Sequence, residues 1–281
     1  MPDFWRAIQA GAGLAPDERA RHFMADFVNP HLQDLRLAGL NHLDAANLES
    51  WFSKVDPILP AIRQLDGRLR PVWARNIADY SKFFPDFDRT RSPVYFMPSF
   101  LRFDAHLEPH SGILPLFIGL DGIVMIHKPD TDLGVLLSHE LFHCYHAQKC
   151  PKIMLDADPP MFANLWIEGL ATYVSERLHP NASLLAVLLD AEDLRARGDS
   201  LLGSWSRELL AKIDSTAPGD IERFFSSGWK GSEPARSGYF VGLMVARRLG
   251  SDVDLPALAA LQPAQLRPLI VRELTVLAGR A

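Results

Sequence analysis

The sequence lacks several features that mark specialised classes of protein. It has only two cysteines, Cys144 and Cys150, among 281 residues. A disulfide framework is therefore not expected, and both are interpreted as ordinary thiols rather than metal ligands. No apolar run reaches the roughly 18 residues of a transmembrane helix, and the start of the chain lacks the basic-then-apolar order of a signal peptide. These absences predict a cytoplasmic protein with no membrane partner.

The charge balance excludes a second set of partners. The chain carries 34 acidic and 29 basic residues, a formal charge of −5, without a dense patch of Lys and Arg. Nucleic acid is therefore not expected as a partner. Hydrophobic residues make up 48% and charged residues 22% of the chain, which is typical of globular proteins. The length allows one large domain or two modest ones.

The first third of the chain is predicted to be helical, with its aromatic residues in the core. Apolar residues at helical spacing indicate helices over residues 17–28, 43–52 and 58–84, the last broken near Gly67 and Pro71. Loop-forming residues from Pro85 to Pro93 then mark a change of pattern. This predicts an N-terminal helical region over residues 1–90 and a second domain over 91–281, although one continuous domain is also possible.

Strand patterns follow this loop. Val94–Met97 and the stretch 114–120 are rich in β-branched and aromatic residues. Asp121-Gly122 is a strong turn signal and predicts a hairpin that returns over 123–126. Its exposed edge could bind an extended peptide as an added strand, although the strands could equally be core alone. One small sheet in an otherwise helical chain predicts the α+β class.

The most informative stretch is His139-Glu140-Leu141-Phe142-His143 within a predicted helix over 133–148. On a helix, His139 and His143 lie on one face and can bind one metal ion. Glu140, beside the first histidine, can act as a base without being a ligand. Glu168, in a second predicted helix over 161–178, is the candidate third ligand. The apolar flanks indicate burial, where unpaired imidazoles are costly.

Helices are also predicted through the rest of the chain. The candidates are residues 184–197, 201–213, 221–225, 234–249 and two short segments after Pro256 and Pro263.

The paired motifs resemble the gluzincin class of zinc metallopeptidases. The first is residues 139–143, and the second is Trp166-Ile167-Glu168-Gly169-Leu170-Ala171-Thr172-Tyr173. Within that class the chain is similar to predicted zinc-dependent proteases whose later helix carries Gly-Tyr-x-x-Gly, here Gly238–Gly242. The resemblance covers roughly residues 115–250. It implies a zincin-like fold, with the small sheet preceding the active-site helix.

The resemblance also implies roles for the residues. His139, His143 and Glu168 would hold one Zn²⁺ per chain, and Glu140 would be the general base that deprotonates a zinc-activated water. Tyr239 is the first candidate for the donor that stabilises the oxyanion, with Tyr173 and Arg236 as alternatives. A core tyrosine is an equally good interpretation of Tyr239. No other cofactor-binding residues are identified.

Neighbouring residues leave alternatives open. His146 is interpreted as a residue behind the ligands or on the surface, because the sequence does not continue as a metzincin would. Thr172 occupies a position where some gluzincins have an acid that orients a ligand histidine. Asp156, Asp190 or a backbone carbonyl would then have to do so here.

The leading hypothesis is thus a zinc-dependent peptidase that acts on peptides or proteins. The alternative is a non-catalytic binding or regulatory protein in which zinc stabilises a zincin scaffold, with a closed site completed by His146 or Asp156. A third hypothesis is that the motif occurs by chance and binds no metal. Substrate specificity, endopeptidase against aminopeptidase action and the oligomeric state are not readable from the sequence.

Overall fold

A computed structural model describes residues 1–127 and 129–279. Contacts within the chain group it into two compact units. The first comprises Met1–Val72 and Asp88–Asp130, and the second comprises Trp73–Phe87 and Thr131–Ala281. The boundary falls inside one helix, α5, between Val72 and Trp73. A domain boundary near residue 90 stays a prediction.

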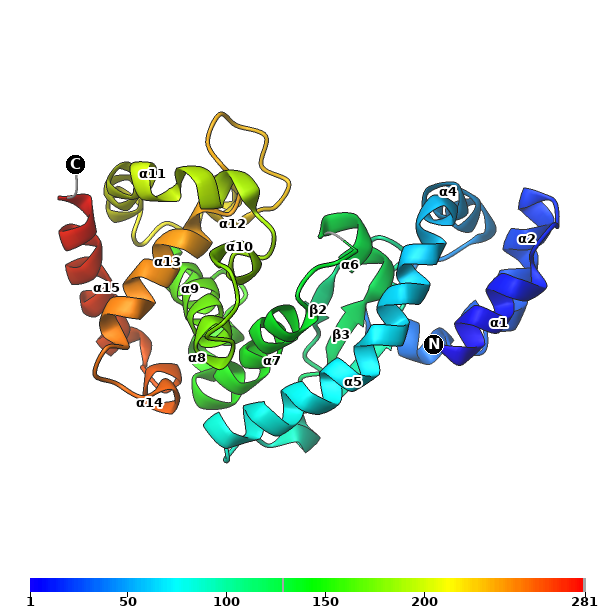
Figure 1. Ribbon diagram of the computed structural model, residues 1–281, viewed down its shortest axis with the longest axis horizontal. Helices are drawn as coiled ribbons and strands as arrows, with labels where there is room; N and C mark the ends of the chain where they lie inside the picture. Colours follow the sequence, from blue (N-terminus) through cyan, green and yellow to red (C-terminus); the bar gives the residue numbers. More distant parts are fainter. Residues whose placement is uncertain (128, 280–281) are drawn as a thin grey trace. The chain divides into compact units, whose positions relative to one another are not determined.

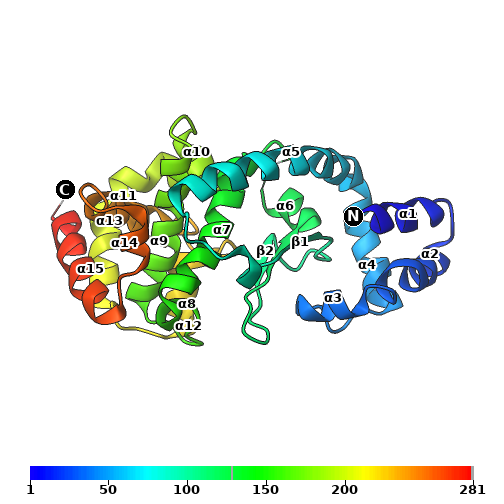
Figure 2. The same cartoon turned by 90° about the horizontal axis from the view of Figure 1, so that it is seen from below.

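The first unit begins with short helices that pack through aromatic residues. These are α1 (Pro2–Ala10), α2 (Pro16–Phe23), which continues as a wider turn η1 (Met24–Val28), α3 (Leu32–Leu37), α4 (Ala45–Val55) and the short turn η2 (Asp56–Ile58). The rings of Phe4, Phe23 and Trp51 meet at centroid distances of 5.5–6.2 Å. Figure 2 shows the helices that carry them, α1, α2 and α4, beside one another. The prediction that aromatic residues of the first third belong to the core is confirmed for Trp51, Phe52, Tyr80 and Phe84 but wrong for Phe83, whose side chain is exposed.

A three-stranded sheet completes this unit after the turn η3 (Arg89–Arg91). Its strands are β1 (Val94–Met97), β2 (Ala105–Leu107) and β3 (Leu116–Gly119), in the order β1-β3-β2. The central strand β3 runs parallel to β1 and antiparallel to β2. The predicted positions of β1 and β3 are confirmed, whereas β2 was not anticipated.

The predicted hairpin after β3 is wrong, because Asp121 and Gly122 lie inside a helix, α6 (Leu120–Ile126). The Asp121 carboxylate accepts hydrogen bonds from the loop at Ser99 and Leu101. A Cβ on Gly122 would lie 1.8 Å from the Phe103 carbonyl oxygen, so the glycine is needed for close approach rather than for a turn. Long-range contacts thus override the local turn signal.

The predicted break near Gly67 and Pro71 is also wrong, because α5 (Leu59–Phe83) runs through both residues. Proline removes one helical hydrogen bond and crowds the carbonyl four residues earlier. Here that carbonyl belongs to Gly67, which adds no side chain to the crowding. Packing at both ends of α5 outweighs the local cost: Leu65 is buried in the first unit and Tyr80 in the second.

The second unit is helical, apart from loops, throughout its described residues (73–87 and 131–279). After the end of α5, its elements are α7 (Leu133–Lys149), α8 (Pro151–Met154), α9 (Met161–Leu178), α10 (Leu184–Val187), α11 (Glu192–Ala211), α12 (Pro218–Phe225), α13 (Ser237–Leu249), α14 (Leu255–Ala259) and α15 (Pro263–Ala278). Figure 1 shows α9 at the centre, and it packs against both α7 and α13. The predicted helices that carry the two motifs are confirmed.

One predicted interruption in this unit is wrong. Gly198 lies within α11, which joins the end of one predicted helix to the next. A Cβ on Gly198 would meet the ring of Phe240 at 2.9 Å, so this glycine makes room for α13.

The coarse fold prediction is therefore confirmed: the chain is mostly helical with one small sheet, in the α+β class. Among residues 1–127 and 129–279, no helix combines the length and apolarity that crossing a bilayer requires.

Candidate metal centre

Helix α7 presents the two histidines of the motif on one buried face. The Asp132 carboxylate caps its first turn by accepting hydrogen bonds from the amides of Gly134 and Val135. Four residues apart, His139 and His143 have ring centroids 4.8 Å from each other and nearly perpendicular planes. The predicted arrangement of the two imidazoles on one helix is thus confirmed.

Helix α9 brings the third predicted ligand to these rings. Oε2 of Glu168 lies 3.3 Å from Nε2 of His139 and 3.7 Å from Nε2 of His143. One ligand atom from each residue lies within 4.8 Å of the others. Zinc–ligand bonds of about 2.0–2.1 Å in a tetrahedron separate ligand atoms by roughly 3.4 Å. The two distances to Glu168 are close to this separation, and the three side chains together could hold a metal ion.

Burial and charge hold the cluster in the protonation states that metal ligands need. Burial lowers the pKa of His143; the charge of Glu168 opposes this shift and His139 adds to it, and together they bring the pKa to about 4. For Glu168, burial favours the neutral acid, but His143, His139 and a hydrogen bond from Tyr239 together lower its pKa. At neutral pH, His143 is thus a neutral imidazole and Glu168 a carboxylate, the forms that bind metals.

The cluster has three protein donors among the described residues, and neither His146 nor Asp156 is one of them. Asp156 is exposed, and its carboxylate accepts a hydrogen bond from the amide of Asp158. Three donors are typical of a catalytic zinc site, whereas structural sites are usually closed by four. The closed site that would favour a purely structural metal is not formed by these two residues.

His146 is fully buried, so its surface interpretation is wrong. Its ring packs against Phe142 at a centroid distance of 5.5 Å, and burial lowers its pKa to about 3. Neither ring nitrogen has a hydrogen-bond partner among residues 1–127 and 129–279. His146 is therefore a neutral imidazole within the protein interior.

None of the predicted side chains orients the ligand histidines. Nδ1 of His139 and of His143 has no hydrogen-bond partner among the described residues, and the Nε2 atoms face Glu168. The Thr172 hydroxyl donates a hydrogen bond to the backbone carbonyl of Glu168 at 2.7 Å. One carboxylate oxygen of Asp190 is itself buried without a partner. Nε2 is thus the atom that each imidazole offers to a metal.

Two glycines explain why α9 and α13 come close enough to complete the site. A Cβ on Gly169 would lie 2.3 Å from the backbone of Gly242, and a Cβ on Gly242 would lie 2.5 Å from the Leu165 carbonyl oxygen. The helices therefore touch backbone to backbone at this crossing. Glu168 precedes one of these glycines, and Tyr239 lies one turn before the other. The crossing accordingly sets a ligand and an aromatic residue side by side.

Tyr239 lies at the metal cluster. Its ring stacks on His139 at a centroid distance of 5.9 Å and an interplanar angle of 10°. Its hydroxyl is hydrogen-bonded to Glu168. Burial, followed by the charge of Glu168, raises the pKa of Tyr239 well above 10, although the guanidinium of Arg236 acts in the opposite direction. Tyr239 is therefore a neutral hydrogen-bond donor.

The two alternatives to Tyr239 have different surroundings. The Tyr173 hydroxyl donates to the Gly250 carbonyl at 3.2 Å and accepts from Arg177, so it is bonded elsewhere. The Arg236 guanidinium lies 5.7 Å from the Tyr239 ring centroid and donates to the Leu189 carbonyl. Arg236 is thus near the site, whereas Tyr173 supports the end of α13.

Glu140 is half-buried beside the cluster and is not one of the three grouped donors. Its negative charge contributes to the raised pKa of Tyr239, which places the two side chains in the same electrostatic environment. Glu140 therefore borders the metal cluster, as a general base requires.

A buried polar network on another face of α7 was not anticipated from the sequence. The Ser138 hydroxyl lies 2.8 Å from Oδ1 of Asn76 and 2.8 Å from Nε2 of His179. Asn76 also donates to the carbonyl of Gly134. These bonds tie α7 to the end of α5 and to the residue that follows α9. The only signal in the sequence was a serine directly before the first histidine.

Both cysteines are buried, and neither forms a disulfide or belongs to the metal cluster of the described residues.

Comparison of the chain with protein-family models, with curated proteins and with solved structures finds no match. The functional argument therefore rests on the residues and geometry of this site.

Proposed function

We propose that this protein is a zinc-dependent peptidase of the gluzincin type, with a zincin-like fold, that hydrolyses peptide bonds. The observation that carries the proposal is the convergence of His139, His143 and Glu168, with ligand atoms within 4.8 Å of one another, next to Glu140. A reducing compartment such as the cytoplasm suits a chain whose two cysteines are not joined. When bound, zinc would lower the pKa of a water and polarise the scissile carbonyl.

Glu140 performs the proton transfers in this proposal. As a carboxylate beside the cluster it accepts a proton from the water that attacks the carbonyl. It then delivers that proton to the nitrogen of the departing amine. A side chain on rigid helix α7 keeps its position through both steps. A positioned general base or acid typically accelerates a reaction by about 10²–10⁴-fold.

Tyr239 has the properties of an oxyanion donor. Its phenol stays protonated at neutral pH, and its hydroxyl is within hydrogen-bonding reach of a ligand carboxylate. To stabilise an oxyanion it would exchange its bond to Glu168 for a bond to the oxygen that becomes negative. Such a donor stabilises charge as it develops, which is why its removal lowers kcat.

The decisive experiment measures zinc content and peptide hydrolysis in the same preparations. Wild-type protein should contain about one zinc per chain and cleave members of a mixed peptide library. Glu140→Gln should keep its zinc and lose activity by at least about 10²-fold. Glu18→Gln, an exposed glutamate on α2, is the matched control and should retain both.

Other results would favour the competing hypotheses. Stoichiometric zinc without hydrolysis of any peptide would favour a non-catalytic zinc-stabilised protein. A Glu140→Gln variant that cleaves as fast as wild type would refute the mechanism. Sub-stoichiometric zinc in both wild type and His139→Ala would refute metal binding altogether.

A further inference from the structure

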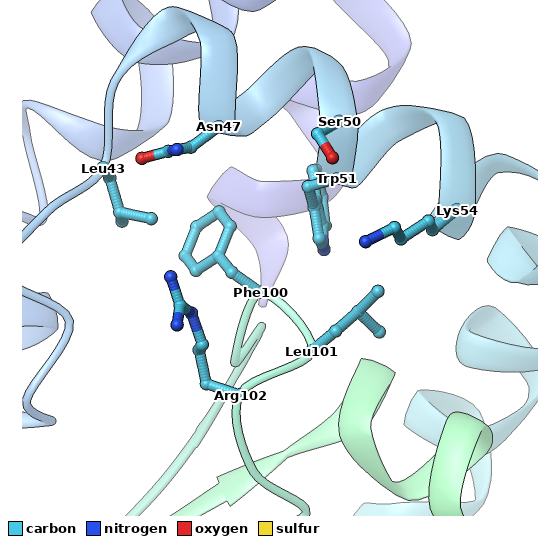
Figure 3. Close-up of a pocket in the computed structure, with 8 residues that line it drawn as sticks. All are labelled: Leu43, Asn47, Ser50, Trp51, Lys54, Phe100, Leu101 and Arg102. Atoms are coloured by element: carbon cyan, nitrogen blue, oxygen red, sulfur yellow. The ribbon is translucent and has the colours of Figure 1, made fainter.

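The first unit contains a cavity of about 360 Å³ that is independent of the metal cluster. One wall is a face of α4 that includes Asn47, Ser50 and Lys54. The opposite wall is the loop after β1, including Phe100 and Arg102. Figure 3 shows Lys54 extending along α4 toward Trp51, and Arg102 extending from the loop toward α4. The volume lies within the range of small-molecule sites.

The loop wall is held in a strained conformation. Phe100 and Leu101 have φ values of 55° and 60°, in the left-handed region that bulky residues rarely adopt. Strain of this kind persists only where surrounding contacts impose it, and it gathers at functional sites.

Buried Asp121 supplies those contacts. One carboxylate oxygen accepts hydrogen bonds from the amide and hydroxyl of Ser99, at 2.6 and 2.9 Å. The other accepts from the Leu101 amide at 2.9 Å and from Nε1 of Trp51 at 3.0 Å. One carboxylate thereby fixes the loop and the α4 aromatic residue that lines the cavity. The two walls are thus preformed relative to each other.

The cavity combines an apolar floor with a cationic rim. Trp51 and Phe100 are almost fully buried, whereas Lys54 and Arg102 are exposed. No acidic residue is among its lining residues. Two exposed cations at the rim, with aromatic side chains among the lining residues, favour an anion that carries a flat apolar group.

We propose that this cavity binds a small organic anion, with a carboxylate or phosphate head group between Lys54 and Arg102. Its flat apolar part packs on Trp51 and Phe100. Asn47 and Ser50 supply neutral hydrogen bonds at the rim. The guanidinium can hold either head group in a bidentate manner, so both belong to the proposed class.

Calorimetric titration of the full chain tests the site with probes of one size and different head groups. Phenylacetate and phenyl phosphate are the anions, benzyl alcohol is the neutral analogue and phenethylamine the cation. At least one anion should bind at least tenfold more tightly than benzyl alcohol, and added salt should weaken it. The tighter anion identifies the head group. Equal binding of neutral and anionic probes would overturn the proposal.

Substitutions of the lining residues test whether the anion binds in this cavity. Lys54→Gln and Arg102→Gln remove exposed charges and should each lower the anion affinity at least tenfold. Arg36→Gln, an exposed arginine on α3 of the same unit, is the control and should change it less than twofold. Equal losses in all three variants would show non-specific attraction and refute the site.

Two further measurements separate this site from the metal centre and test its apolar floor. His139→Ala should bind the anion as wild type does, because the cavity does not use the metal ligands. Loss of binding in that variant would place the anion at the metal and refute the cavity, whatever the peptidase assay shows. Inorganic phosphate should bind at least tenfold more weakly than phenyl phosphate, and equal affinity would refute a role for Trp51 and Phe100.

Discussion

Asp121 in the first unit and Glu168 in the second are both carboxylates held among protein groups, yet their surroundings differ. Asp121 is 1% exposed and accepts four hydrogen bonds from backbone, hydroxyl and indole donors. The Glu168 side chain is 21% exposed and faces two imidazoles and a phenol. A carboxylate with all its acceptor sites filled is structural, whereas one that shares space with neutral imidazoles remains able to bind a cation.

The largest expected effect tests the structural half of this contrast. Asp121→Asn puts an NH₂ group against donors such as Trp51 Nε1 and the Leu101 amide. It should destabilise the protein by about 3–5 kcal/mol, because buried donors lose their acceptor. In metal-free protein, Glu168→Gln should cost less than about 1 kcal/mol. Urea unfolding in the presence of a chelator measures both free energies of unfolding. Equal losses of stability would contradict the difference between the two carboxylates.

The next effect tests the helix crossing that positions Glu168. Gly242→Ala places a methyl group 2.5 Å from the Leu165 carbonyl oxygen, so α9 and α13 must separate. We expect a loss of about 1–3 kcal/mol together with reduced zinc content. Gly219→Ala is the matched control, since its Cβ meets nothing within 4 Å. It should be neutral or slightly stabilising, and a similar loss there would contradict the role of the crossing.

Removing the Tyr239 hydroxyl tests how Glu168 is tuned. Tyr239→Phe should keep the stacking on His139 but remove the hydrogen bond to the carboxylate. We expect about a 10–100-fold loss in zinc affinity or activity, as is typical of groups that support a ligand. Tyr173→Phe removes a hydroxyl bonded to Gly250 and should leave zinc binding unchanged. Competition with a chelator of known affinity measures both, and equal zinc affinities in the two variants would show that the Tyr239 bond is dispensable.

The smallest effect concerns Asp104 in the first unit, whose carboxylate lies 2.8 Å from Nε2 of His127. Burial alone would raise the pKa of Asp104, but His127 lowers it below its ordinary value of 3.8. The stabilisation is therefore present above about pH 4 and is lost as the pH falls through the folded pKa.

Asp104→Asn should accordingly cost about 1 kcal/mol at pH 7, and that difference from wild type should shrink as the pH falls below 4. Urea unfolding at pH 7 and at pH 3 measures it. A difference that grows on acidification would show that the carboxylate is not stabilised by His127.

Residue patterns with local causes were readable from the sequence. The predicted bounds of α9 and of β1 match the structure, and so does the predicted start of α7 at residue 133. The three candidate ligands were named from spacing and motif. The turn at Gly122 and the helix break at Gly198 were predicted wrongly, because these glycines allow close contacts with distant residues rather than local turns.

The sequence by itself determined the helical character of the chain, the position of its candidate metal-binding motif and the identity of the three candidate ligands. These depend on spacing along one helix and on residue chemistry. Only the tertiary structure decided that Glu168 meets the two imidazoles, that Tyr239 bonds to it, and that Asp121 shapes a cationic cavity. Those outcomes depend on which side chains and glycines meet across separate elements, and contacts of that kind leave no periodic pattern in the sequence.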